Sequence, residues 1–220
     1  MGNSLVIDKD KLILVEGKDD RAAIYKIVRS LGIDNIQVAY MEGKDNADKF
    51  IDTLSAALKT PQSKNISIKA FAIILDADEE DAKSSFMKVC SFLKEIQKRN
   101  IKNLDFEIPK KCAEFTNGNT NVGVFIMPNC ETPGMLETLC MESVSNEPFF
   151  ECVNDFINKA RSIKPDLDHV EKRKALSYIA LSASKGQRKS TGEAVEDGIF
   201  NINSGAFNKI KSFLTDMSNL

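Results

Sequence analysis

The chain has 220 residues, a formal net charge of -2 and a pI of about 5.6. This balance does not imply the strongly basic face of a tight nonspecific nucleic-acid binder, although it leaves room for a local basic groove. A hydrophobic share of 42% suits one α/β domain, or one domain with a helical appendage. Because no apolar run reaches membrane-spanning length and the N-terminus lacks a signal-peptide pattern, we expect a cytoplasmic protein without a membrane partner.

The cysteines are odd in number and none forms a CxxC pair, so we expect reduced thiols in a reducing cytoplasm. They are Cys90, Cys112, Cys130, Cys140 and Cys152. The only histidine, His169, stands in a charged segment and is expected at the surface. A zinc site is therefore not expected.

Short apolar runs alternate with amphipathic stretches over the first two thirds of the chain. The first run (LILV) ends at Glu16 and Gly17, and the third (IKAFAIIL) ends at Asp76. The patterns predict the following elements in chain order: strand 12–15, helix 19–31, strand 36–40, helix 46–59, strand 68–75, helix 79–99, strand 122–127 and helix 134–140.

Helical periodicity dominates the last third. It predicts helices over 149–163, 170–183 and 207–217, with a basic loop at 184–192. Together with the β-α alternation before it, this predicts an α/β fold: a mostly parallel, Rossmann-like sheet flanked by helices. We expect a core over residues 1–145 and a helical C-terminal part over residues 146–220 that packs on the same domain.

Acidic residues follow two of the predicted strands directly. Glu16 ends the first strand, Asp76 and Asp78 end the third, and Asp20 lies one helical turn beyond Glu16. The carboxyl ends of parallel strands meet at one edge of the sheet, so these side chains should converge there. Converging carboxylates repel one another unless a cation compensates them, and an all-oxygen set selects Mg²⁺ or Mn²⁺. A single Asp after a strand is also common as a helix cap; the two motifs together favour the metal site.

Two segments, LILVEGKDD (residues 12–20) and AIILDADEE (residues 72–80), resemble the Toprim domain of topoisomerases, primases and overcoming-lysogenization-defect (OLD) nucleases. The acidic residue four positions after Glu16 is most similar to the OLD branch. Residues 122–143 also resemble a small, single-domain, Toprim-like (DUF3226-like) bacterial and archaeal family. The resemblance covers roughly residues 10–145 and implies a Toprim-like fold. It implies metal ligands at Glu16, Asp20, Asp76, Asp78 and Glu137.

A lysine late in the domain is also implied by the resemblance to OLD nucleases, where such a cation stabilises developing charge. Lys174 is the preferred candidate because it precedes an apolar helical stretch, and Lys185 is the second. Lys44, after the second strand, is a third candidate from the same sheet edge. A solvated lysine on a helix explains Lys174 at least as well, a solvated loop is the plainer explanation of Lys185, and an ordinary turn lysine is the alternative for Lys44. Unlike the OLD proteins, the chain has no P-loop motif.

The resemblance implies Mg²⁺- or Mn²⁺-dependent hydrolysis of phosphodiester bonds in DNA or RNA, with Glu16 as a ligand or as a general acid/base and Lys174 beside the substrate. A non-catalytic metal- or phosphate-binding module, acting through a partner protein or nucleic acid, is the alternative. A phosphatase or nucleotidyl transferase with a small substrate is a third possibility. A homodimer is compatible with all three.

Overall fold

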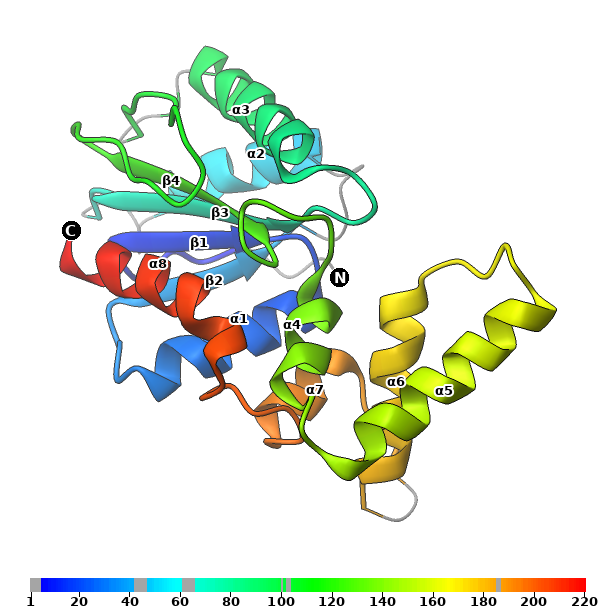
Figure 1. Cartoon of the computed structure of the whole chain (residues 1–220). Helices are drawn as coiled ribbons and strands as arrows, with labels where there is room; N and C mark the ends of the chain where they lie inside the picture. Colours follow the sequence, from blue (N-terminus) through cyan, green and yellow to red (C-terminus); the bar gives the residue numbers. More distant parts are fainter. Residues whose placement is uncertain (1–4, 42–46, 61–65, 100, 102–103, 185–186) are drawn as a thin grey trace.

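The computed structural model describes residues 5–41, 47–60, 66–99, 101, 104–184 and 187–220, with the side chains of residues 47–50 left out. Within this part of the chain, one parallel sheet forms the centre of the molecule (Figure 1). The strand order is β2-β1-β3-β4. The strands are β1 (Lys11–Val15), β2 (Ile36–Tyr40), β3 (Ala70–Asp76) and β4 (Asn121–Met127).

The two central strands are apolar on both faces because helices cover both sides of the sheet. All residues of β1 are buried, and so are the first five residues of β3. Ile13 lies in register with Val38 of β2 and with Ala72 of β3. Continuous apolar runs such as LILV are the pattern expected for parallel strands that are enclosed on both sides.

Two hydrophobic clusters lie on the two faces of the sheet. The helices α2 (Ala47–Ala57) and α3 (Ala82–Lys98) cover one face, seen at the top of Figure 1. The other face is covered by α1, α4 and α8, with α7 packed against α1. These helices are α1 (Lys18–Ser30), α4 (Leu136–Ser143), α7 (Thr191–Glu196) and α8 (Asn208–Asn219), the last preceded by the short 3₁₀ turn η2 (Gly205–Phe207).

The strand order reverses between β1 and β3. From β1 the chain crosses to β2 on one side, and from β3 it crosses to β4 on the other. In an open parallel sheet, the crevice outside the carboxyl ends of two such strands is where ligands bind. The reversal therefore marks the ends of β1 and β3 as the expected site.

A helical pair, α5 (Pro148–Ile163) and α6 (Val170–Ser182), extends away from the sheet (Figure 1, yellow-green to yellow). The chain then returns through α7, whose Gly192 lies against the start of α1. A Cβ atom at this position would come within 2.6 Å of the Asp19 carbonyl oxygen. Only glycine allows the two helices to approach so closely, and this contact brings residues from the end of the chain to the edge of the sheet.

The predicted α/β fold with a parallel sheet and a helical C-terminal region is confirmed, and the described strands are all parallel. Element ends differ by a few residues from the predicted ones. One element was missed: α7 begins at Thr191, inside the predicted loop 184–192. The division into residues 1–145 and 146–220 stays a prediction.

The prediction of five reduced thiols is wrong for one pair, since Cys112 and Cys130 form a disulfide. These residues flank β4 in sequence, and the short return of the chain along β4 brings them together, which cysteine spacing does not reveal. Among the helices of the described residues, none has the length and apolar character needed to cross a bilayer.

Candidate metal centre at the sheet edge

Glu16 and Asp20 are brought together by the turn that joins β1 to α1. Gly17 is the N-cap of α1, and its backbone N–H donates a hydrogen bond to Asp20 Oδ2 at 2.9 Å. This hydrogen bond holds the Asp20 side chain close to the end of β1. An acidic side chain in the first turn also interacts favourably with the helix dipole.

Asp76 and Asp78 follow β3 and are held by the loop between β4 and α4. The backbone N–H of Leu136 donates to Asp76 Oδ1 at 3.0 Å. Asp78 and Gly134 exchange two backbone hydrogen bonds, both 2.8 Å long. Asp78 adopts a left-handed conformation with φ of 57°, which aspartate tolerates better than most residues. The turn after β3 is therefore clamped to the start of α4.

Glu137 is buried in the first turn of α4, at 7% exposure. Its Oε1 accepts a hydrogen bond from the hydroxyl of Thr191 at 2.9 Å. Thr191 is itself buried and opens α7. The C-terminal part of the chain thus holds one of the carboxylates that the sequence predicted for the site.

Electrostatic effects show that these carboxylates are mutual neighbours. Burial raises the pKa of Asp20 to about 6; the Gly17 hydrogen bond opposes this shift, and the negative charges of Glu137 and Glu16 add to it. The pKa of Asp76 is raised well above its ordinary value by burial, and then by Asp20, Glu137 and Asp78. The negative charge of each carboxylate therefore disfavours the ionised form of its neighbours, as expected for like charges in a partly desolvated space.

One thiol shares this environment. Cys140 lies on α4, one turn after Glu137, and is fully buried. Burial raises the pKa of its thiol, and the charges of Glu137 and Asp76 raise it further. With its thiol protonated and fully buried, Cys140 packs beside the cluster as a small apolar side chain.

Among the described residues, three carboxylates are each anchored by a hydrogen bond to one oxygen. Gly17, Leu136 and Thr191 donate to Asp20 Oδ2, Asp76 Oδ1 and Glu137 Oε1. Within the described residues, the second oxygen of each of these carboxylates accepts no hydrogen bond from the protein. Such oxygens suit a hard cation, which prefers carboxylate ligands. As they stand, however, no three Asp, Glu, His or Cys side chains of the described ranges are close enough to hold a metal ion.

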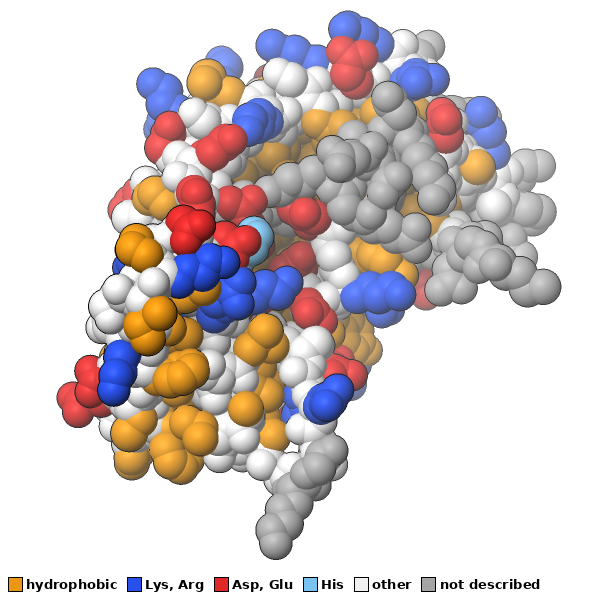
Figure 2. Space-filling view, turned by 90° about the vertical axis from the view of Figure 1, so that its right-hand side faces the viewer, with side chains coloured by type: hydrophobic (Ala, Val, Ile, Leu, Met, Phe, Trp, Pro, Cys, Tyr) orange, Lys and Arg blue, Asp and Glu red, His pale blue; other side chains and the backbone are white. Residues whose placement is uncertain are grey.

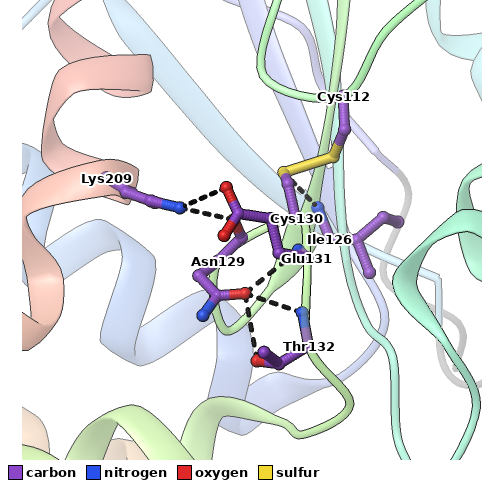
Figure 3. A network of polar contacts seen from close by, with 7 residues as sticks. All are labelled: Cys112, Ile126, Asn129, Cys130, Glu131, Thr132 and Lys209. Carbon is purple, nitrogen blue, oxygen red and sulfur yellow. Dashed lines mark hydrogen bonds and ion pairs between the residues drawn. A yellow bond between two sulfur atoms is a disulfide. The ribbon is translucent and has the colours of Figure 1, made fainter.

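The loop from β4 to α4 has its own polar framework, drawn in Figure 3. Asn129 Oδ1 accepts hydrogen bonds from the backbone N–H groups of Glu131 and Thr132 and from the Thr132 hydroxyl. Lys209 of α8 reaches the Glu131 carboxylate at 2.7 Å, and the disulfide ties Cys130 to Cys112. These contacts fix the loop that ends near Gly134. They therefore support the two backbone hydrogen bonds between Gly134 and Asp78.

A cavity of about 940 Å³ opens beside the carboxylates. Among the described residues, it is lined by the turn after β3, the first half of α3, the start of α4 and the N-terminus of α6. Figure 2 faces this side of the molecule and shows acidic side chains around a hollow, with lysine and arginine side chains next to them. Asp76 and Asp78 belong both to the carboxylate cluster and to the cavity wall.

Asp76 has Asp20, Glu137 and Asp78 as charged neighbours, and Glu16 acts on Asp20, whereas the lysines differ. The role of these acids as metal ligands stays a prediction. Lys174 pairs with Glu171 on its own helix, with 2.9 Å between Nζ and Oε1. The strongest charge effects on Asp20 and Asp76 come from other carboxylates. Lys44 and Lys185 lie outside the described residues. The catalytic role of Lys174 stays a prediction.

Thr191 was missed by the sequence reasoning. The signal that would have found it is the capping box formed by Ser190 and Glu193 at the start of α7, an S-x-x-E pattern that predicts a helix N-terminus. His169 is exposed, as expected, and lies on the cavity wall.

The model of one protein family, described as "Protein of unknown function (DUF3226)", matches residues 10–219. The chain belongs to this family. The predicted DUF3226-like relationship is thereby confirmed. No curated protein matches the chain.

Solved structures also resemble the DUF3226 chain. A hypothetical protein from Pyrococcus horikoshii OT3 superposes with a TM-score of 0.56 at 16% identity, with 94% of each chain covered. This likeness supports the fold alone. The C-terminal region of the OLD protein from Xanthomonas campestris pv. campestris gives a TM-score of 0.44 at 15% identity, covering 97% of this chain and 98% of that one.

Proposed function

We propose that the protein hydrolyses phosphodiester bonds in nucleic acid with Mg²⁺ or Mn²⁺ bound by Glu16, Asp20, Asp76, Asp78 and Glu137. The observation that carries the proposal is the anchoring of Asp20, Asp76 and Glu137 through one oxygen each, at the point where the strand order reverses. Carboxylates buried in mutual repulsion lower stability, so their convergence favours a role that uses a compensating cation.

The bound ion would supply positive charge that activates water and stabilises the leaving oxygen. The residues of the chain would orient the ligands and exchange a proton with the substrate. Gly17, Leu136 and Thr191 hold three carboxylates in orientation through hydrogen bonds, as second-layer groups do in metal sites. Glu16, at the end of β1, would exchange a proton with the attacking or leaving oxygen.

Lys174 would act only after leaving Glu171, its partner on α6. Both residues are part-buried, so the pair is more restrained than a fully exposed one. We therefore assign Lys174 a smaller effect than any of the acids: it would stabilise charge that develops on the substrate phosphate.

The test compares cleavage of plasmid, single-stranded DNA and RNA in Mg²⁺, in Mn²⁺ and in a chelator. Asp76→Asn keeps an oxygen that accepts the Leu136 hydrogen bond but removes the charge, and Asp216→Asn removes an exposed charge on α8 as a matched control. We expect Asp76→Asn to lower the cleavage rate by about 100-fold or more, and the control to behave as wild type. Cleavage that survives Asp76→Asn unchanged would refute the proposal.

The alternative, a module that binds a metal or phosphate without turnover, has one observation in its favour. The carboxylates of the described residues do not form a closed cage, so a site of this kind would be completed by a ligand. Calorimetric titration of Mn²⁺ separates the two functions. Binding that Asp76→Asn abolishes, with no cleavage of any polynucleotide, would assign the module instead of the nuclease.

A further inference from the structure

The cavity beside the carboxylates has an apolar interior. Its walls include side chains from β3, α3, the start of α4 and the start of α6. These apolar lining residues are Met41, Leu75, Val89, Phe92, Met135 and Val170. Ligand cavities of this size commonly pair such walls with a few polar groups that fix the orientation of the bound molecule.

Three acidic residues of the cavity lining are paired with cations of the protein. Glu80 pairs with Lys88 at 2.6 Å. Asp168 pairs with Arg173, and Glu171 with Lys174, at 2.6 and 2.9 Å. Each of these ion pairs offsets one acidic charge of a lining that also contains Glu79. Negative charge concentrates at the inner end, where Asp76 faces Asp20, Glu137 and Asp78.

The mouth of the cavity is formed in part by a fixed turn before α6. Arg173 Nε donates to the Asp168 carbonyl oxygen at 2.8 Å, and its Nη2 bonds the Asp168 carboxylate. The next residue, His169, has a left-handed backbone with φ of 49°. The turn presents the imidazole at the edge of the cavity, while the ring of Phe92 forms part of its wall.

A ligand that matches this space carries an anionic group at one end and a flat apolar group at the other. The anionic group belongs at the carboxylates, where a cation would bridge it. A nucleotide unit has this shape: a phosphate, and a base whose faces stack on aromatic rings. A base inside a duplex is already stacked and paired, so it could enter the cavity only after extrusion, which costs free energy.

We propose that this cavity binds an unpaired nucleobase next to the reacting phosphate, so that the substrate is single-stranded or has a frayed end. The inference rests on the proposed function, because it places the phosphate at the carboxylate cluster. It adds the strandedness of the substrate, which the carboxylates alone do not determine.

The first experiment measures the binding of a short fluorescent DNA strand, its duplex, and the same strand with a single abasic site. Ca²⁺ replaces Mg²⁺, so binding is read without turnover. We expect the intact strand to bind about tenfold more tightly than the duplex, and several-fold more tightly than the abasic strand. Equal affinity for strand and duplex, no binding of either, or indifference to the abasic site would overturn the proposal.

The second experiment changes the cavity wall. Phe92→Leu removes the ring but keeps an apolar side chain on α3, and Phe86→Leu makes the same change on that helix outside the cavity lining. We expect Phe92→Leu to reduce the preference for the single strand about fivefold, with Mn²⁺ binding unchanged. An undiminished preference in Phe92→Leu would overturn the assignment of this wall to the base.

These outcomes are separable from failure of the proposed function. Loss of metal-dependent cleavage or of Mn²⁺ binding concerns the carboxylates. The strand-to-duplex ratio concerns the cavity, and because it is a ligand-side comparison it does not depend on the folding of any variant. A protein that cleaves strand and duplex equally would keep the proposed function and lose this inference.

Discussion

Polar side chains have opposite surroundings at the two edges of the parallel sheet. At the edge where the strands begin, the side chains of Lys11, Thr120 and Lys69 have complementary partners. Lys11 is 5% exposed and donates to the Ser218 carbonyl oxygen, and Thr120 is buried and donates to the Ile68 carbonyl oxygen. Lys69 pairs with Asp10 at 2.7 Å. The buried side chains of Lys11 and Thr120 thus follow the rule that buried polar groups are satisfied, and Asn35 Oδ1, just before β2, is the exception among the described residues.

At the edge where the strands end, side chains of one charge are gathered instead. Asp76 lies among Asp20, Glu137 and Asp78, and each raises its pKa. The hydrogen bonds present there orient these carboxylates without neutralising them. The difference teaches that the first edge contributes to stability, whereas the second retains an unfavourable arrangement of the kind that functional sites show.

The largest expected effect is a pH dependence confined to the carboxylate edge. The pKa of Asp20 is about 6 in the folded protein, above its ordinary value of 3.8. The folded state therefore holds the proton more tightly than the unfolded chain. In a chelator, the contribution of Asp20 to the free energy of unfolding is therefore largest below about pH 4, falls as the pH rises to about 6, and stays low above that.

Asp20→Asn removes this contribution, so the free energy of unfolding of the variant should exceed that of wild type at pH 7.5 by on the order of 2 kcal/mol and match it near pH 4. The measurement is urea unfolding in a chelator across this range. A difference between the two proteins that does not change with pH would contradict the prediction. Adding Mn²⁺ at pH 7.5 should reduce the difference in free energy of unfolding between the variant and wild type, because the ion compensates the Asp20 charge of wild type.

The second prediction concerns the contact that ties α7 to the carboxylate edge. In Gly192→Ala the new Cβ would meet Asp19 backbone atoms at 2.6 and 2.7 Å. We expect the free energy of unfolding to fall by about 2 kcal/mol, although alanine normally stabilises a helix relative to glycine. Mn²⁺ affinity should fall as well, because Thr191 would shift from Glu137.

Gly118→Ala is the matched control, since its nearest non-neighbouring atom would lie at 3.8 Å. Thermal unfolding and calorimetric titration of both variants provide the measurements. Equal stability of the two alanine variants would show that α7 does not depend on this close approach.

A smaller effect is expected from the opposite edge. Thr120→Val keeps the shape of the side chain but removes the hydroxyl that donates to the Ile68 carbonyl oxygen. Loss of this buried hydrogen bond should cost about 1 kcal/mol at every pH between 5 and 8. Mn²⁺ should stabilise this variant as much as it stabilises wild type. A changed response to Mn²⁺ would mean that the two edges are coupled.

The smallest effect belongs to Lys69→Ala, which breaks an ion pair with Asp10 in which both side chains are partly exposed. We expect the free energy of unfolding to fall by less than about 1 kcal/mol, and by a smaller amount at high salt. Chemical denaturation at low and high salt measures it. A loss of about 2 kcal/mol or more would mean that the strand-beginning edge depends on this ion pair far more than a partly exposed pair normally allows.

Much of the site could be predicted because strand ends are visible in sequence. The apolar runs before Glu16 and Asp76 predicted parallel strands, and parallel strands place their carboxyl ends together. Glu137 was found only through a family resemblance. The disulfide between Cys112 and Cys130 was not predicted, because pairing depends on the distance between residues that β4 separates.

The sequence by itself determined the order of the elements, the parallel sheet and the group of acidic residues at its edge, because apolar periodicity and strand ends are local properties of the chain. Only the tertiary structure decided which groups orient those acids, and which of them share a cavity. The Thr191 hydroxyl reaches Glu137 across 54 residues of sequence, and the Leu136 N–H reaches Asp76 across 60. Contacts of that range depend on how helices pack, and no local pattern encodes them.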